Sequence, residues 1–403
     1  MTRSSRATRL GSEPRAGLRL PYVVAFLSHS SSIGGAELSL VNTLAYLDTA
    51  VVTPHVILPR RGPLEARLQA IGVPYSFATY QPWLATRNGL GPFAVRAGIS
   101  VLGLAGLIRH IAQLKPALVW TNSLVTPQGS VVAALLHVPH VWQVREVIRL
   151  NPTMRSPLHG DWLLTFSARI SARVVAVSEA ARDQYPPRWR GRVKVIHNGI
   201  PDDFGAGWSS STWSGTGEGP VLILVGVLSP VKRQTDAIVT LAILRERYPG
   251  IRLTLIGDGT ARYRHELRDF ARRQGVEHRV LFAGQIADPR IAMASGHIML
   301  VPSVSESFGL TTVEALAIGM PIVAARAGAT SEILARGGGV MVPPRRPDLM
   351  AAAVDDLLRS PKCMEELGRQ GRVAARSFTI SREAKAIQEE IVAIAEAADR
   401  HGG

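Results

Sequence analysis

The stretch of sequence that decides the fold reads HIMLVPSVSESFGLTTVEALAIG and covers residues 297–319. Its first part, His297–Val301, is a short apolar run, which predicts a buried strand. A polar loop follows, and a helical pattern then begins near Thr311 and stops at Gly319, a residue suited to the C′ position of a helix. The order strand, loop and helix predicts one unit of a parallel α/β sheet.

Two carboxylates occupy this junction, Glu306 in the loop and Glu314 in the first turn of the expected helix. A helix N-terminus offers unpaired N–H groups and a favourable dipole to an anion such as a diphosphate. Gly309 lets the backbone approach a ligand closely, and a carboxylate can accept hydrogen bonds from two neighbouring hydroxyls. These features together predict a site for a nucleotide sugar, which carries a diphosphate and vicinal hydroxyls.

Both carboxylates also have ordinary structural explanations. Thr311 and Glu314 have the spacing of a capping box, in which the glutamate reaches back to the start of its own helix. Glu306 also fits a solvated acid in an exposed loop. From the residues alone, both alternatives stay open.

Strands and helices alternate along most of the chain, which predicts parallel, doubly wound sheets. The expected strands are Tyr22–Leu27, His55–Leu58, Leu118–Thr121, His140–Val144, Arg173–Val177, Val193–Ile196, Val221–Val225, Arg252–Ile256, Arg279–Phe282, His297–Val301 and Pro321–Ala325. Because the order of elements begins again after Pro220, we predict two facing Rossmann-like domains. Ligands of such sheets bind at the carboxyl ends of the strands, so the cleft between the domains is the expected site.

The stretch from Phe204 to Pro220 is rich in Ser, Gly, Thr and Trp and predicts a linker. We therefore expect five segments along the chain. These are a flexible basic arm (1–20), an N-terminal acceptor domain (21–203), the linker (204–219), a C-terminal nucleotide-sugar domain (220–380) and a last helix (381–403) that packs back on the first domain.

Composition narrows the partners and the compartment. The formal net charge is +15, which favours anionic partners, whereas aromatic residues make up 6% and offer little stacking surface for nucleic acid. We expect no nucleic-acid partner. The single cysteine, Cys363, fits a reducing compartment. The basic arm lacks the apolar region of a secretory signal; its arginines are Arg3, Arg6, Arg9, Arg15 and Arg19.

The most hydrophobic stretch, Ala97–Ile108, is too short to span a bilayer. It predicts a buried helix, with a helix that lies in a membrane surface as the alternative. We expect a cytoplasmic protein, with attachment to the inner membrane face through anionic lipids as the second interpretation.

The chain resembles the retaining glycosyltransferases of family 4, which have the GT-B architecture, over about residues 20–380. The most specific part is Glu306-Ser-Phe-Gly-Leu, followed by Glu314-Ala-Leu-Ala-x-Gly-x-Pro-Ile-Val and Gly328. Weaker matches in the right order are Gly34-Gly35-Ala36-Glu37, Val177-Ser178-Glu179, Asn198-Gly199, Gly257-Asp258-Gly259 and Gly284.

The resemblance implies a role for each matching residue. Glu314 would bind the ribose hydroxyls, Glu306 would contact the transferred sugar, and Lys232 would neutralise the departing phosphates. Arg145, although it departs from the family pattern, is our third candidate catalytic residue beside Glu306 and Lys232. The remaining donor-binding residues would be Gly34, Gly35, Arg233, Gly284, Phe308, Gly309 and Leu310. Taken alone, Lys232 also fits a surface lysine at the start of a helix.

The resemblance further implies retention by front-face attack, in which the leaving phosphate takes the proton of the acceptor hydroxyl. The chain contains no Asp-x-Asp, so we expect no metal ion. Lys232, Arg233 and the helix N-terminus would stabilise the charge of the diphosphate instead. No cofactor is implied besides the nucleotide-diphosphate sugar as co-substrate. The acceptor would be a hydroxyl of a glycan, a lipid-linked glycan or a small metabolite.

Three positions depart from the family pattern. Val227 stands where the family usually has Arg, so one cation of the phosphate site is missing unless Arg233 or Arg326 replaces it. Arg145 stands where many members carry His; it would bind donor phosphate or acceptor, or else form a salt bridge with Glu146 or another acid. His297 stands where Asp is common, and we interpret it as structural.

Two other kinds of function fit the same fold. One is epimerisation or hydrolysis of a nucleotide sugar without a separate acceptor. The other is a non-catalytic scaffold, which Val227 keeps open. A nicotinamide-dependent dehydrogenase is disfavoured, because no Gly-x-Gly-x-x-Gly follows the first strand.

Overall fold

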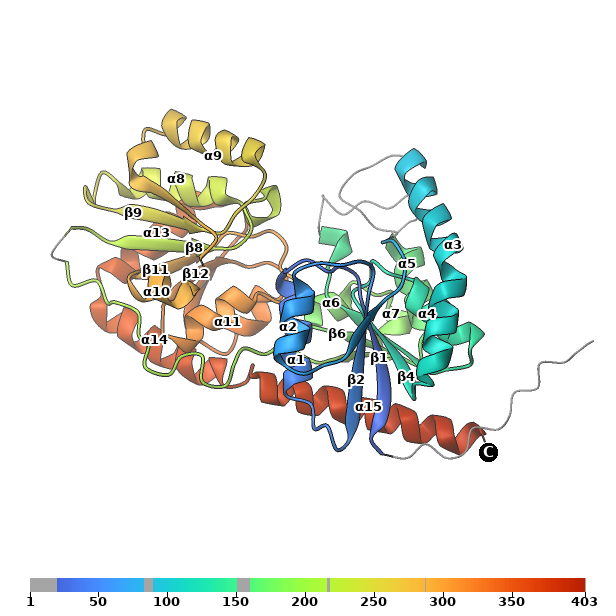
Figure 1. Ribbon diagram of the computed structural model, residues 1–403. Coiled ribbons are helices and arrows are strands. Elements are labelled where there is room, and N and C mark those ends of the chain that lie inside the picture. The colour runs from blue at the N-terminus through green and yellow to red at the C-terminus, as the bar shows by residue number, and fades with distance from the viewer. Residues whose placement is uncertain (1–19, 83–89, 151–159, 216–217, 287, 403) are drawn as a thin grey trace, which may run out of the picture.

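The computed structural model describes residues 20–402 except 83–89, 151–159, 216–217 and 287. The expected basic arm at 1–20 therefore lies outside the described residues apart from Leu20. The described chain forms two lobes, each built on one parallel sheet (Figure 1). This is the α/β, GT-B arrangement that the sequence predicts, with two facing Rossmann-like domains.

The N-terminal domain holds a seven-stranded sheet in the order β3-β2-β1-β4-β5-β6-β7, and all its pairings are parallel. Its strands are β1 (Tyr22–Ser28), β2 (Val52–Leu58), β3 (Tyr75–Phe77), β4 (Leu118–Asn122), β5 (His140–Val144), β6 (Arg173–Ala176) and β7 (Val193–Val195). Its helices are α1 (Gly35–Ala45), α2 (Leu64–Ala70), α3 (Leu90–Leu114), α4 (Gln128–Leu135), η1 (Ile148–Leu150), α5 (Gly160–Ile170), α6 (Glu179–Asp183) and α7 (Pro187–Arg190). Strands β4 and β5 are buried throughout, as expected of a parallel sheet covered on both faces.

The C-terminal domain holds a six-stranded parallel sheet in the order β10-β9-β8-β11-β12-β13. Its strands are β8 (Val221–Val225), β9 (Arg252–Ile256), β10 (Val280–Gly284), β11 (Ile298–Val301), β12 (Ile322–Ala325) and β13 (Gly339–Val342). Its helices are η2 (Pro230–Lys232), α8 (Gln234–Leu244), α9 (Ala261–Arg273), η3 (Glu277–Arg279), α10 (Pro289–Ala294), α11 (Leu310–Ala317), α12 (Thr330–Leu334), α13 (Pro347–Leu358) and α14 (Pro361–Ala375).

The strand order fixes where the site lies in each domain. In the first sheet β1 stands between β2 and β4, and in the second β8 stands between β9 and β11. The chain therefore reverses its direction of winding beside β1 and beside β8, and ligands of such sheets bind at these switch points. The loops that follow β1, β8 and β11 lie at these points.

The two domains are joined at a double crossing of the chain. Ile200 pairs with Thr379 there, with Ile200 N donating to Phe378 O and Ile380 N donating to Ile200 O. The segment expected as a linker, 204–219, packs on the C-terminal domain where it is described. Ser210 donates from its backbone to Ile318 O, and Trp213 is buried in the core of that domain.

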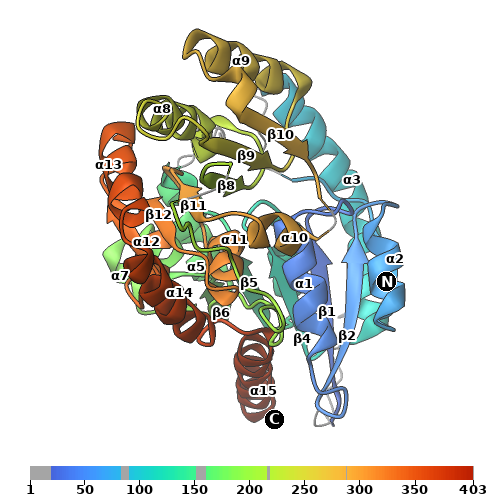
Figure 2. The ribbon, with the colours of Figure 1, turned by 90° about the vertical axis from the view of Figure 1, so that its left-hand side faces the viewer.

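The last helix, α15 (Ile380–Gly402), starts at this crossing and runs beneath the first sheet (Figures 1 and 2). Ala384, Ile387, Ile391 and Ile394 on its apolar face join the core formed with α1, α2 and the strands. The chain therefore returns to the N-terminal domain. Within the described residues, no helix is both long enough and apolar enough to cross a membrane.

Candidate donor site between the domains

The loop from β11 to α11 begins the site. Gly309 adopts a left-handed φ of 94° and is the N-cap of α11, and its carbonyl accepts from Thr312 N and Val313 N. The helix thus starts at Leu310, and its first N–H groups are available to an anion. On the other side of the loop a Cβ on Gly328 would come within 2.4 Å of the Glu306 carbonyl oxygen. That glycine therefore allows the close packing of the loop.

This helix start corrects two expectations about Glu314. The helix was expected to begin near Thr311, with Glu314 in its first turn, but no acidic residue lies in the first turn of α11. The N-cap is Gly309 and makes no side-chain cap hydrogen bond, so Thr311 and Glu314 do not form a capping box. The reason is the left-handed turn at Gly309, which starts the helical hydrogen bonds earlier than the side-chain pattern indicates.

Glu306 and Lys232 form an ion pair at the centre of the site. Lys232 Nζ lies 2.5 Å from Glu306 Oε1, and Glu306 is 7% exposed. Glu306 is therefore not a solvated loop acid, and Lys232 is not a free surface lysine. Lys232 ends η2, where its chain passes 3.4 Å from the point that a Cβ on Gly226 would occupy. The sequence separation of 74 residues means that folding, not local structure, brings the pair together.

Glu314 lies one turn further along α11 and is half-buried. Burial raises the pKa of its carboxyl to about 7, and the negative charge of Asp288 adds to this effect. A carboxylate in such a place gains from hydrogen-bond donors supplied by a ligand, because hydrogen bonds favour its ionised form.

Arg145 reaches the site from the carboxyl end of β5 and is 7% exposed. Its Nε donates to Asn122 Oδ1 (2.5 Å), and its Nη1 donates to Ser39 Oγ and Asn198 Oδ1 (both 2.9 Å). The expected alternative, a salt bridge with Glu146, does not form, since the Glu146 carboxylate accepts from the Arg145 backbone N. The Nη2 group is buried without a partner among the described residues.

One cavity of about 210 Å³ gathers most of the predicted residues from both domains. It is lined by Gly35, Ala36, Arg145, Val177, Asn198, Lys232, Glu306, Ser307, Phe308, Gly309, Leu310 and Thr311. Phe308 contributes backbone here, because its ring is buried against Phe378 at the domain crossing, with the ring centroids 5.6 Å apart.

Four predicted residues lie outside this lining. Glu314 follows it along α11, and Gly34 is the extended N-cap of α1, next to Gly35. Gly284 ends β10 with a left-handed φ of 69°, and its carbonyl accepts from Gly257 N. Arg233 turns away from the cavity, as described next.

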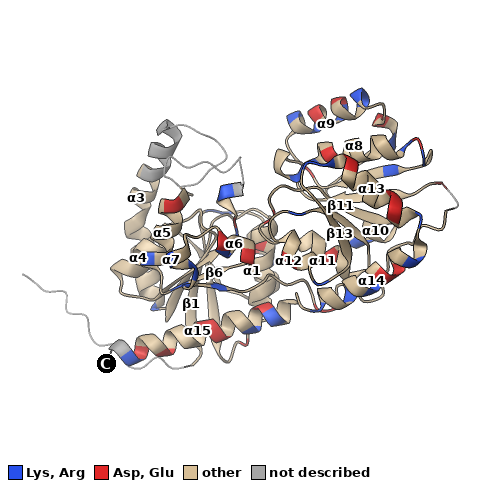
Figure 3. Ribbon diagram, turned by 180° about the vertical axis from the view of Figure 1, so that it is seen from behind, with Lys and Arg blue, Asp and Glu red and all other residues tan. Residues whose placement is uncertain are grey.

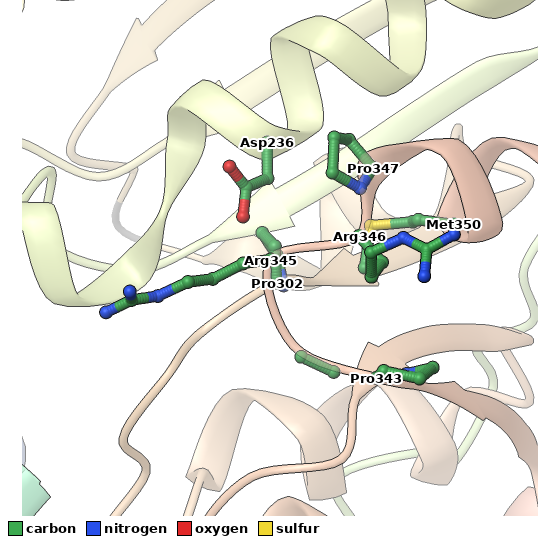
Figure 4. Close-up of a pocket in the computed structure, with 8 residues that line it drawn as sticks. Asp236, Pro302, Pro343, Arg345, Arg346, Pro347 and Met350 are labelled. Atoms are coloured by element: carbon green, nitrogen blue, oxygen red, sulfur yellow. The ribbon is translucent and has the colours of Figure 1, made fainter.

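The phosphate site was expected to need a second cation beside Lys232, supplied by Arg233 or Arg326 in place of the arginine that Val227 replaces. None of these three positions supplies a cation to the cavity. Val227 is 63% exposed and brings no charge. Arg233 makes two hydrogen bonds to the carboxylate of Asp236, which enters a separate small hollow at the carboxyl ends of β11, β12 and β13 (Figure 4). Arg326 is exposed after β12. Of the described cations that line the cavity, Arg145 is therefore the one with an unpaired donor.

Sequence reasoning missed two residues of this arrangement and interpreted a third as structural. Asn198 entered only through the weaker match Asn198-Gly199, without a role at the site, and its place after the strand β7 was the available signal. Glu383 on α15 gave no local signal at all, although its Oε2 accepts from Gly199 N at 2.7 Å. His297 accepts from Val221 N through Nδ1 and packs against Trp213, away from the cavity, as a structural histidine would.

The described residues include no cluster of potential metal ligands.

Two family models match the chain, one in each domain. The model described as Glycosyltransferase Family 4 matches residues 33–204, and the one described as Glycosyl transferases group 1 matches residues 214–374. Among curated proteins, a D-inositol 3-phosphate glycosyltransferase 2 of Catenulispora acidiphila is 34% identical over 203 residues, which cover 47% of this chain and 47% of that protein. The chain thus spans about half the length of this relative.

Solved structures share the fold over nearly the whole chain. Alr3699/HepE of Anabaena, solved in complex with UDP-glucose, has a TM-score of 0.73 at 24% identity and covers 92% of this chain and 100% of its own. Sucrose-phosphate synthase of Thermosynechococcus elongatus has a TM-score of 0.70 at 18% identity, with 92% of this chain and 98% of that chain covered.

Proposed function

This chain belongs to the family 4, group 1 glycosyltransferases, and from that premise we propose that it transfers a sugar from a nucleoside diphosphate sugar to a hydroxyl acceptor. The observation that carries the proposal is the cavity between the domains. It combines the free N-terminus of α11, the Lys232–Glu306 pair and the unpaired Nη2 of Arg145.

The donor has one placement that uses all these groups. The diphosphate would lie at the N-terminus of α11, facing Gly35 across the cavity, where N–H groups and two cations offset its charge. The ribose hydroxyls would donate to Glu314, and the transferred sugar would lie beside Glu306. The acceptor would then enter from the N-terminal domain. The UDP-glucose complex of the Anabaena protein supports uridine donors as the first to be tried.

The chemical step that we propose retains the configuration at the anomeric carbon. The bond from this carbon to the phosphate oxygen breaks, and a bond to the acceptor oxygen forms on the same face. The proton of the acceptor hydroxyl passes to the departing phosphate oxygen. Lys232, Arg145 and the helix N-terminus would stabilise the diphosphate charge as it develops, in the manner of fixed, preorganised donors. The reaction so written needs no metal ion and no cofactor.

The test is an assay with UDP-, GDP- and ADP-sugars in the presence of a chelator, with and without a lipid or glycan extract. We expect release of nucleoside diphosphate that depends on the acceptor, and a product with the donor's anomeric configuration by NMR. An epimerised donor would instead identify an epimerase, and acceptor-independent release would identify a hydrolase. Binding of donor without turnover would favour a scaffold.

We further propose a lipid-linked acceptor at an anionic membrane surface, because α3 carries an exposed apolar face. Val101 is 70% exposed and Leu102 85%, which differs from the buried helix that the sequence favours. Leu102 also lines a hollow of about 310 Å³ with Pro59 and Phe77. In Figure 3 the described part of α3 is mostly uncharged, whereas α9, α14 and α15 mix both signs.

Basic residues flank this face, as expected of a surface that meets anionic headgroups. The Arg61 guanidinium lies 5.2 Å from the centre of the Phe77 ring. Arg60, in the loop after β2, and Arg109, in α3, are also exposed. The combination of an apolar patch with a basic rim favours a lipid surface over a purely polar glycan.

Leu102→Glu should reduce binding to vesicles that contain anionic lipid by about tenfold, because it removes apolar area and adds a repelled charge. Co-sedimentation with phosphatidylglycerol vesicles measures the effect. The matched control is Val373→Glu on α14, where the side chain is 56% exposed on the other domain. Equal binding by both variants would contradict the membrane contact.

A further inference from the structure

Glu383 is a buried carboxylate at the crossing between the domains. It lies in the first turn of α15, is 2% exposed, and accepts from Gly199 N through Oε2 at 2.7 Å. The fit around this contact is tight, since a Cβ on Gly199 would come within 2.2 Å of the Thr379 carbonyl carbon. Glu383 therefore fixes the position of the Asn198–Gly199 segment against the start of α15.

The negative charge of Glu383 has no direct ion-pair partner among the described residues. An uncompensated buried carboxylate is costly. Burial raises its pKa to about 7, against the opposing effects of Arg145, the Gly199 N–H and the hydroxyls of Thr43 and Ser39. Arg145 is thus the nearest source of compensating charge.

The Arg145 guanidinium and the Glu383 carboxylate lie next to the same residues. Arg145 Nη1 donates to Ser39 Oγ and to Asn198 Oδ1. Ser39 also faces Glu383, and Asn198 precedes the glycine whose N–H Glu383 accepts. One of the three oxygens that hold the Arg145 guanidinium, Asn198 Oδ1, therefore belongs to the segment that Glu383 holds, and a second, Ser39 Oγ, lies beside the Glu383 side chain. The charges that face Arg145 from other elements are those of Glu146 and Glu37, and each is weaker in its effect than that of Glu383.

We propose that Glu383 is a positioning residue for donor turnover. It holds the Asn198–Gly199 segment beside Ser39, and this segment and Ser39 fix the Arg145 guanidinium at the wall of the cavity. Glu383 thereby couples this cation to the crossing where the two domains meet. The inference rests on the proposed function in one respect, namely that Arg145 contacts the donor or the acceptor.

The test compares Glu383→Gln with a matched change on the same helix. Glutamine keeps the size of the side chain and an acceptor for Gly199 N, and removes the charge. The control is Glu390→Gln, since Glu390 is 4% exposed on α15 and pairs with Arg173 and Lys194 (both 2.5 Å) away from the cavity. We expect Glu383→Gln to lower kcat/KM for the donor about ten- to hundredfold, as loss of a well-placed charged hydrogen bond does. Glu390→Gln should leave kcat/KM within about twofold and lower stability instead.

A double-mutant cycle separates positioning from plain stability. In an Arg145→Met background, Glu383→Gln should lower kcat/KM by less than about twofold, because the group it positions is already gone. If Glu383→Gln has the same effect in both backgrounds, or matches Glu390→Gln, the proposal is wrong while the proposed function stands. If Glu383→Gln does not fold, Ser39→Ala tests the same link, and an unchanged kcat/KM there overturns the proposal. Absence of turnover by the wild-type protein overturns both.

Discussion

Replacing Lys232 with Met should lower kcat about 10²- to 10³-fold and raise the KM for the donor much less. Lys232 Nζ is the cation that the C-terminal domain places at the cavity. Negative charge develops on the departing diphosphate in the transition state, and a fixed cation at this place stabilises that charge. Val227 is exposed and Arg233 is bound to Asp236, so no neighbour among the described residues of this domain replaces Lys232. Initial rates of nucleoside diphosphate release over a range of donor concentrations measure the effect.

The substitution also leaves Glu306 buried without its partner, which costs about 3–5 kcal/mol in stability. The double variant Lys232→Met with Glu306→Gln should regain most of this stability and stay inactive, so lost folding and lost chemistry can be told apart. Lys194→Met is the matched control, because it breaks a Lys–Glu pair of the same 2.5 Å length outside the cavity. A Lys232→Met variant with a kcat within about threefold of the Lys194→Met value would contradict the assigned role.

Replacing Glu314 with Gln should weaken nucleotide binding about ten- to hundredfold and at the same time stabilise the free protein. The carboxylate would accept from two ribose hydroxyls, and hydrogen bonds to a charged group are worth about 1.5–3 kcal/mol each. Titration calorimetry with UDP and a thermal unfolding curve at pH 8 measure the two effects. A variant that loses stability and keeps its nucleotide affinity would show a structural glutamate.

The sign of the stability change follows from the pKa of Glu314, which burial raises to about 7. Between the ordinary value for a glutamate and 7, the folded protein binds more protons than the unfolded chain, so its stability falls as the pH rises through this range. Above pH 7 the carboxylate is ionised at a cost of up to about 3 kcal/mol, and glutamine removes this cost. The wild type should also release a proton when it binds UDP near pH 7, and Glu314→Gln should release fewer.

The fold was predictable where strands are apolar along their whole length. The runs at β8 and β11 are fully or nearly buried and stand out in the sequence. The edge strands β3 and β13 were missed, because they have only three and four residues, most of which are half-buried. The linker prediction did not include packing, and Trp213, which looks isolated in the sequence, is buried in the core of the C-terminal domain.

The sequence allowed us to predict which residues belong to the site, but not which of them contact one another. Spacing and resemblance pointed to Lys232 and Glu306, but their pairing spans 74 residues. The adjacent Arg233 looked equivalent to Lys232, and the left-handed backbone at Arg233 instead directs its side chain to Asp236. Glu383 was out of reach, because its contact with Gly199 spans 184 residues and depends on how α15 returns to the first domain.

Hydrogen exchange of the wild-type protein with and without a UDP-sugar tests the central claim most directly, because it locates the donor without relying on turnover. We expect protection to concentrate in peptides covering 303–317, with a second, smaller effect in the segment around Gly35, and Glu314→Gln to reduce both. Protection confined to other parts of the C-terminal domain, or equal protection in the wild type and in Glu314→Gln, would contradict the placement of the donor at the start of α11.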